Sequence, residues 1–318
     1  DPLVVQKFSV ILCKICKKKT SDPKMQTNAI RGTGHLVCLV YSDIDRKSAY
    51  QESIDISAVL VQALDTLVVP VQKTISLARK EIKDNLSWKE RSSIKKLGWG
   101  ACHTLSLVLS TVQTSAHELD DCCVNSIHVC LQTLINCVYN VECVHEKVAL
   151  VAMSALCSVD LSSSRLAPSF NHDRQLGLGV IISQCLWWIQ GGGSDADAGK
   201  MTVLSPKVKS QMQQLLLHFL SCCSVQDSEN VLSGTLGRDR QLRFLYDWLL
   251  KQKKGSNSVA AQRAFDTFAL AMQKRPDLLS TIDINLEQQF ANQAKTMVSL
   301  HHLEDFDASG DDDNEEEL

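Results

Sequence analysis

Three segments of this 318-residue chain share a pattern that an isolated helix would not require. They span residues 25–36, 97–108 and 148–159. When the segments are superposed, Ala29, Ala101 and Ala152 coincide, and each alanine is followed three positions later by another small residue. Small residues at positions i and i+3 lie on one helix face and allow a neighbouring helix to approach closely. The pattern predicts helices that pack side by side.

Each such helix needs a partner, and the sequence supplies apolar or amphipathic runs between and after the three segments. These runs cover residues 57–69, 124–139, 175–190 and 207–222, with later helical patterns at 242–251, 259–273 and 284–300. Pro70 follows the first run and is predicted to kink or end it, because proline lacks an amide donor. With 14 glycines and 6 prolines, the chain has few turn residues for an all-β protein. We therefore expect an all-α fold of stacked helical hairpins.

The three aligned segments resemble the inner helices of HEAT repeats, and Asn28 stands directly before Ala29 as in that family. The resemblance covers roughly residues 1–275 and implies a HEAT/armadillo-type α-α superhelix with a concave, protein-binding inner face. It implies no catalytic residues. The aligned alanines are 72 and 51 residues apart, more than these repeats usually show, so inserted loops are expected.

Charge divides the chain into a basic body and an acidic end. Residues 1–303 carry 33 basic and 27 acidic groups, whereas residues 304–318 carry nine acids and no lysine or arginine. We therefore predict an α-solenoid over 1–303 and a disordered acidic tail over 304–318. Ser309 precedes Gly310 and three aspartates, a pattern that acidophilic kinases prefer, and is a candidate phosphorylation site.

A glycine-rich stretch interrupts the predicted solenoid at residues 191–199 and is expected to form a mobile loop. Trp187 and Trp188 lie just before it, at the end of an apolar run. An exposed tryptophan is a plausible binding anchor, so both are candidate partner-binding residues, with packing between repeats as the alternative.

Two basic clusters are further candidates for partner binding. The first comprises Lys17, Lys18 and Lys19, and the second comprises Lys253 and Lys254. Basic patches bind nucleic acid electrostatically, but aromatic residues make up 5% of this chain, so base stacking has little to use. We expect protein partners, with a nucleic-acid- or transport-associated solenoid of the karyopherin or chromatin-linked kind as the alternative.

The chain has 13 cysteines, most of them inside apolar helical stretches, which indicates reduced thiols and a cytoplasmic or nuclear location. Cys13 and Cys16, followed by His35 and Cys38, have the paired spacing of a zinc site. Both pairs lie on predicted helices with apolar periodicity, whereas zinc knuckles use tight turns, so buried thiols are the interpretation we favour.

No acid, base and nucleophile can be brought together from the sequence, so we expect neither an enzyme nor a bound metal or cofactor. Uninterrupted apolar runs fall short of a membrane span, and none is predicted. The chain does not begin with methionine, and we expect it to be the C-terminal part of a larger protein. The predicted function is that of a non-catalytic protein-protein interaction scaffold.

Overall fold

The computed structural model of the chain describes residues 2–18, 22–42, 55–79, 86–113, 119–159, 178–190, 204–223, 239–255 and 258–274. Within these ranges the secondary structure consists of ten α-helices with connecting turns and contains no strand. The all-α class is therefore confirmed for the described residues. The chain divides into two compact units, Asp1–Cys222 and Cys223–Leu318, and each is described by itself.

The first unit contains eight described helices that pack as successive pairs. They are α1 (Pro2–Lys17), α2 (Pro23–Tyr41), α4 (Ile56–Ala78), α5 (Trp88–Val112), α6 (Asp121–Tyr139), α7 (Glu146–Cys157), α9 (Leu178–Ile189) and α10 (Pro206–Cys222). The pairs are α1 with α2, α4 with α5, α6 with α7, and α9 with α10.

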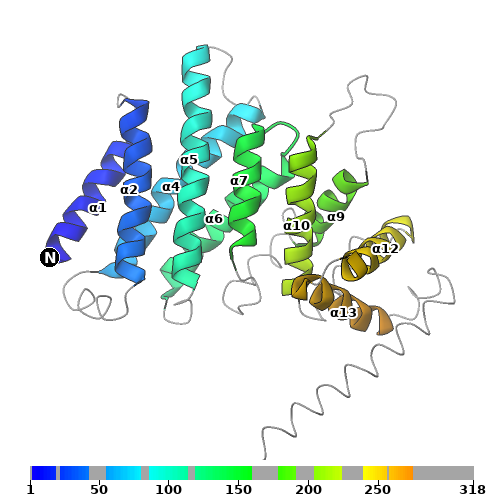
Figure 1. The fold of residues 1–318 in the computed structure, drawn as a ribbon. Helices are drawn as coiled ribbons and strands as arrows, with labels where there is room; N and C mark the ends of the chain where they lie inside the picture. Colours follow the sequence, from blue (N-terminus) through cyan, green and yellow to red (C-terminus); the bar gives the residue numbers. More distant parts are fainter. Residues whose placement is uncertain are drawn as a thin grey trace, which may run out of the picture. The chain divides into compact units, whose positions relative to one another are not determined.

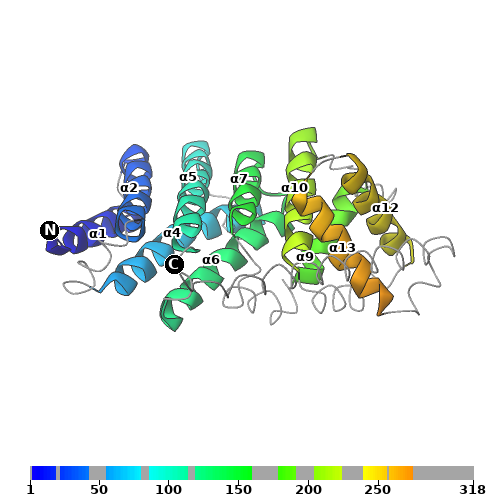
Figure 2. The same ribbon diagram turned by 60° about the horizontal axis from the view of Figure 1, so that its bottom comes forward.

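The pairs stack in two layers, as Figure 1 shows and the turned view in Figure 2 makes clearer. In one layer, α2, α5, α7 and α10 lie side by side, and each packs against the next. In the other layer, α1, α4, α6 and α9 do the same. We call the layer of α1, α4, α6 and α9 the first row, because it holds the first helix of each pair. The layer of α2, α5, α7 and α10 is the second row.

In both rows, helices begin at a capping residue whose side chain accepts a hydrogen bond from a backbone amide of the first turn. These amides have no acceptor within the helix itself. Asp55 accepts from the amide of Ala58 at 2.9 Å, and Asp120 accepts from the amide of Cys123 at 2.7 Å. Ser87 and Glu90 form a reciprocal capping box at the start of α5. Such caps each contribute about 0.5–2 kcal/mol and set where the helices begin.

Small residues let neighbouring helices approach closely, both within the second row and between the rows. A Cβ atom at Gly34 of α2 would collide with the Thr104 side chain of α5. A Cβ at Gly98 of α5 would collide with Thr74 and lie 3.2 Å from the carbonyl oxygen of Pro70, both on α4. The aligned alanines at 29, 101 and 152 are buried on the neighbouring helices α2, α5 and α7. The sequence pattern thus falls on three helices that are neighbours in space.

Proline 70 does not end its helix, contrary to one of the two outcomes predicted for it. Helix α4 continues to Ala78, with Pro70 inside it. Thr74 donates a hydrogen bond to the Pro70 carbonyl at 3.0 Å and is also 3.2 Å from the carbonyl of Ile94 on α5. Packing against both α5 and α6 holds α4 together across the missing amide, since tertiary contacts override local propensity.

Helices α4 and α6 are long and apolar enough, by length and composition, to cross a membrane. More than half of each apolar stretch is buried inside the helical unit. A core helix that packs against several neighbours passes the same test, so this composition is accounted for by burial between the rows. The absence of a membrane span remains a prediction.

The described part of the second unit contains α12 (Asp239–Gly255) and α13 (Val259–Gln273), which pack against each other. Tyr246 and Phe265 bring their ring centroids within 5.9 Å. Lys253 pairs with Asp266 at 3.3 Å and lies 4.6 Å from the centroid of the Phe265 ring. The glycine-rich stretch at 191–199 and the tail at 304–318 lie outside the described residues, so one continuous array to residue 303 stays a prediction.

Candidate functional site

The outward side of the second row presents polar and basic side chains at helical spacing. Opposite the buried residues of each helix, the exposed positions are Lys24, Asn28, Arg31 and His35 on α2, Lys95, Lys96, His103 and Leu107 on α5, Lys147 and Ser154 on α7, and Lys207, Ser210 and Gln214 on α10. Because the four helices lie side by side, these positions form one surface, which we call the second-row face.

Within the first unit, this face belongs to the more basic of the two rows. Helices of the second row carry nine basic residues: Lys24, Arg31, Lys89, Arg91, Lys95, Lys96, Lys147, Lys207 and Lys209. They carry two acids, Glu90 and Glu146. Helices of the first row carry four basic residues and two acids, all told, in a similar length of chain. Positive charge is therefore concentrated on one side of the unit.

Both acids of the second row accept hydrogen bonds from serine hydroxyl groups. Glu90 accepts from the amide and the hydroxyl of Ser87 at 2.8 and 2.7 Å, which lowers the pKa of its carboxyl group. Glu146 accepts from the hydroxyl of Ser205 at 2.8 Å. Neither carboxylate forms an ion pair with a lysine in the part of the chain that the structure describes. The positive charge of the face is thus left available to an external anion.

A cavity of about 430 Å³ opens on this face between α2, α5 and the start of α7. It is lined by Thr27, Ser92, Lys95, Lys96, Trp99, His145 and Lys147, and we call it the lysine pocket. The Trp99 ring is held edge-on against His103, with centroids 4.9 Å apart and planes at 88°. The pocket is lined by three lysines and no carboxylate.

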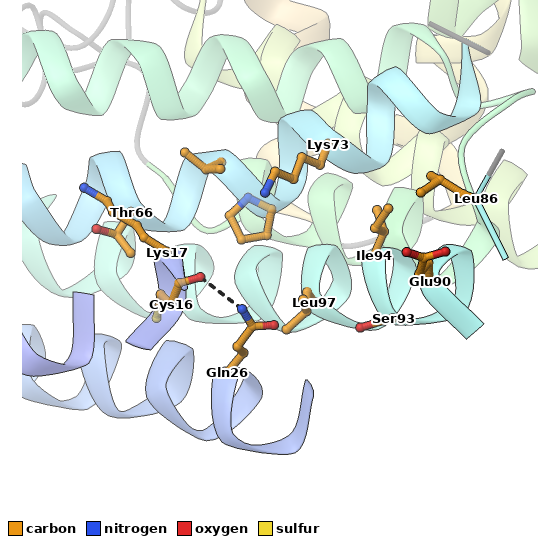
Figure 3. Close-up of a pocket in the computed structure, with 12 residues that line it drawn as sticks. Cys16, Lys17, Gln26, Thr66, Lys73, Leu86, Glu90, Ser93, Ile94 and Leu97 are labelled. Carbon is orange, nitrogen blue, oxygen red and sulfur yellow. Dashed lines mark hydrogen bonds between the residues drawn. The ribbon is translucent and has the colours of Figure 1, made fainter. Parts of the chain in front are cut away.

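A second cavity, of about 360 Å³, lies where α1 ends beside α2, α4 and α5 (Figure 3). Gln26 closes one side of it, donating to the carbonyl oxygens of Cys16 at 3.4 Å and Lys18 at 2.7 Å. Lys17 and Lys73 line it together with apolar residues and Glu90. This cavity combines both signs of charge with an apolar wall, so it selects for charge less strongly than the lysine pocket does.

The two candidate tryptophans have different environments. Trp188 is 2% exposed and part of the core, whereas Trp187 is 38% exposed. Their ring centroids are 4.5 Å apart at an interplanar angle of 71°. Trp188 is therefore buried and is corrected as a binding candidate, whereas Trp187 is accessible and partner binding by it stays a prediction. The helical angle of about 100° between successive residues separates them.

The candidate lysines also differ in their environments. Lys17 and Lys18 are exposed at the end of α1, and Lys254 is exposed on α12. Lys253 is engaged within its own unit by Asp266 and Phe265, so it is not a free cation. Lys19 and Ser309 lie outside the described residues.

The residues of the hypothetical zinc site point to different neighbours. Cys13 donates to the carbonyl of Gln62 on α4 at 3.8 Å, and Cys38 lies 3.3 Å from the hydroxyl of Thr111 on α5. His35 is exposed on α2. Burial raises the pKa of the Cys16 thiol to about 11. Across the described residues, no group of three or more His, Cys, Asp or Glu side chains is placed to hold a metal ion.

Adjacent cysteine and histidine residues do not form a nucleophile pair either. Cys102 is fully buried, and its pKa is raised by a hydrogen bond with Cys137 and by burial, while His103 faces outward. The pair that does approach is Cys222 with His218, at 3.9 Å. His218 Nε2 also lies 2.8 Å from the carbonyl oxygen of Val159, which requires that nitrogen to be the donor. It therefore cannot accept the thiol proton.

The lysine pocket was not among the sites predicted from the sequence. Its lysines come from two helices about 50 residues apart, and Thr27 comes from a third. The detectable signal was the absence of Asp and Glu from residues 23–41, 92–112, 147–157 and 206–222. Grouping the segments by their place in each pair would have revealed the concentration of charge.

In its described part, the chain is an all-helical protein whose first unit stacks helix pairs in two layers and exposes a basic face with a pocket. Comparisons with protein-family models, with curated proteins and with solved structures find no match.

Proposed function

We propose that residues 2–222 form a HEAT-type α-solenoid that serves as a non-catalytic scaffold and binds an acidic protein partner through the second-row face. Three observations support the proposal: the resemblance of three segments to HEAT inner helices, the stacking of helix pairs in two rows, and the basic outward side of one row. Stacked helical pairs provide an extended surface, which repeat proteins commonly use for binding.

The unequal charge of the two rows carries the proposal. Both rows bury apolar side chains against each other, so folding alone does not require nine basic residues and two acids in one row. Like charges on one surface repel, which costs stability unless an anion neutralises them. Exposed apolar residues are interspersed with the charges, including Met25 at 52% exposure and Leu107 at 41%. A surface of mixed basic and apolar character suits a polypeptide with both acidic and apolar side chains.

The proposal also includes the larger protein expected from the sequence. Helix α1 stands at one end of the stack and exposes Val4, Phe8 and Ile11, each more than half accessible. An apolar side of a terminal helix is the surface on which a further helical pair would stack. The cysteines of the described part are free thiols, and several of them are buried. We include in the same proposal a reducing location, in the cytoplasm or the nucleus.

The experiment compares partner capture by the wild-type chain with capture by two charge-reversal variants. The test variant carries Lys95→Glu, Lys96→Glu and Lys147→Glu on the second row. The matched control carries Lys7→Glu, Lys14→Glu and Lys73→Glu, three exposed lysines of the first row. A protein that is captured by wild type and control, lost with the test variant, and then bound directly after purification supports the proposal. Partners that bind all three chains equally contradict it.

A nucleic-acid- or transport-associated solenoid is the second candidate, and the same positive charge favours it. It differs in its dependence on salt. Duplex oligonucleotides of unrelated sequence would bind the wild-type chain with an affinity that falls steeply between 50 and about 200 mM salt. Weak binding to every duplex, together with partner capture that depends on the second row, would exclude this candidate.

A further inference from the structure

We propose that the lysine pocket binds a phosphorylated side chain of the partner protein. This inference rests on the proposed function, since it names the chemistry by which the second-row face holds its partner. It is carried by the pocket's composition, by the orientation of His145, and by the absence of internal counter-ions among the residues that line it.

Among the described residues, the three lysines of the pocket have no acidic partner. Lys95, Lys96 and Lys147 are exposed, and none of them forms an ion pair within the described ranges. The hydroxyl of Thr27 donates to the carbonyl of Pro23 at 2.8 Å, which leaves Ser92 as the pocket's free hydroxyl donor. Ammonium groups act as point charges toward phosphate, and several of them around one cavity favour a multiply charged anion.

His145 adds a donor whose direction is set by the fold. As the N-cap of α7, its Nδ1 atom accepts a hydrogen bond from the amide of Lys147 at 3.3 Å. An accepting Nδ1 carries no proton, so the proton of the neutral ring is on Nε2. The Nε2–H group is thereby free to donate to an anion. The positive end of the α7 dipole points the same way, while Glu146 in that first turn is hydrogen-bonded to Ser205.

The chemistry of the pocket favours a phosphoryl group over a carboxylate. A phosphorylated side chain carries about −1.5 to −2 charges at neutral pH and three acceptor oxygens, whereas a carboxylate carries a single charge. A cavity of about 430 Å³ also has room for the side chain that bears the phosphate. The three lysines of the pocket therefore attract a phosphate dianion more strongly than a singly charged carboxylate.

The surroundings of the pocket favour a polypeptide over a nucleic acid. Met25, Leu39 and Leu107 are 52%, 42% and 41% exposed on α2 and α5, two of the three helices that line the pocket. Peptide side chains can cover these residues, whereas a phosphate backbone cannot. Trp99 is the aromatic residue in the pocket lining, and its ring is already engaged by His103, so no series of stacking platforms is present there.

The experiment measures binding of fluorescein-labelled degenerate peptides to the full chain by fluorescence polarisation. One peptide set has a fixed central phosphoserine, and the other has serine at that position. We expect the phosphorylated set to bind at least about 10-fold more tightly at physiological salt, because of the extra charge and acceptors. The pocket variant Lys95→Gln, Lys96→Gln and Lys147→Gln should lose this preference.

The matched control removes the same charge from helices of the second row but outside the pocket. It carries Arg31→Gln, Lys207→Gln and Lys209→Gln, and it should keep the preference. Equal loss in both variants would assign the effect to general electrostatics and overturn the proposal. Equal affinity of the wild-type chain for both peptide sets would also overturn it, as would competition by inorganic phosphate as effective as that by the peptide, or tighter binding of a single-stranded oligonucleotide through the same lysines.

The two proposals fail in different ways. If charge reversal of the second row abolishes partner capture but no preference for phosphoserine is found, the phosphate site is wrong and the scaffold proposal stands. If capture does not depend on the second row while phosphopeptides bind the pocket, the partner-binding face is wrong and the pocket is a separate site.

Discussion

The two rows of the first unit bury similar surfaces and expose different ones. In the first row, α4 and α6 are apolar enough to pass a membrane-span test, and exposed apolar residues such as Phe8, Val69 and Val129 lie on its helices. In the second row, lysine and arginine are the most frequent exposed residues, and Met25, Leu39 and Leu107 are exposed among them. Inward faces must match because each row packs on the other, whereas outward faces are free of that constraint. The difference therefore separates residues needed for stacking from residues available for binding.

The largest expected effect is the difference in alkylation rate between buried and exposed cysteines. Cys102 and Cys130 are fully buried between the rows, and burial keeps the pKa of Cys130 well above its usual value. Cys122 and Cys143 are exposed. Alkylation at pH 8, followed by peptide mass spectrometry, should modify the exposed pair at least about 100-fold faster, because thiolate and access are both needed. Comparable rates in the native protein would show that the rows do not pack as described; the urea-unfolded chain supplies the control.

Overpacking the interface should lower stability substantially. Ala101 is fully buried on α5, and replacing it with leucine forces neighbouring helices apart. We expect Ala101→Leu to reduce the free energy of unfolding by about 1–3 kcal/mol in urea titrations. His103→Leu, two positions away on the outward side, is the control and should change it by less than about 0.5 kcal/mol. Equal effects of the two substitutions would mean that the inward and outward faces of α5 are misassigned.

Caps in the two rows should differ in pH dependence. The pKa of Asp120 is lowered mainly by the hydroxyl of Ser57, on α4, and by the Cys123 amide, whereas that of Glu90 is lowered by Ser87 alone. A carboxyl group with a lowered folded pKa stabilises the protein above its unfolded value and loses this contribution as the pH falls through the folded pKa. Unfolding should therefore be easier for Asp120→Asn than for Glu90→Gln at pH 7, because Asp120 also joins two helices.

The difference between the two cap variants should shrink as the pH falls through the lowered folded pKa values of Asp120 and Glu90, because the wild-type carboxylates are then protonated. Urea midpoints measured from pH 7 to 2.5 test this. A gap between the variants that does not change with pH would show that side-chain packing, and not charge, distinguishes the caps.

The smallest effect on folding is expected on the second-row face itself. Single Lys95→Gln, Lys96→Gln and Lys147→Gln substitutions should each change the free energy of unfolding by less than about 0.5 kcal/mol, since exposed charges contribute little. Thermal melts of purified variants measure this. A loss above 1 kcal/mol would mean that these lysines serve the fold, which would weaken the case that they serve binding.

Local signals predicted individual helices well in several places. The predicted run at 259–273 coincides with α13, and the run at 207–222 matches α10 to within one residue. The run at 124–139 missed the first turn of α6 because the Asp120 cap lies ahead of its apolar residues. Pro70 was expected to interrupt α4 and does not end it, because contacts with two neighbouring helices outweigh the local cost.

The candidate site was far less predictable. Nothing in the local sequence distinguishes Lys95 and Lys147, which share a pocket, from Lys7 and Lys14, which lie on the first row. Likewise, an apolar run that ends in two tryptophans does not reveal that Trp188 is buried and Trp187 is exposed. These distinctions depend on which side of each helix faces its neighbours.

By itself, the sequence determined the all-α class, the approximate bounds of most described helices and the small residues at which helices meet, because these follow from periodicity, capping and side-chain size within a few turns. The tertiary structure alone decided which helices share a row, which lysines converge on the pocket, and which cysteines are inaccessible. The reason is that pairing of helices 50 to 70 residues apart is set by the packing of whole faces. The lysines form a candidate binding site only because helix packing exposes them on the same side of the second row.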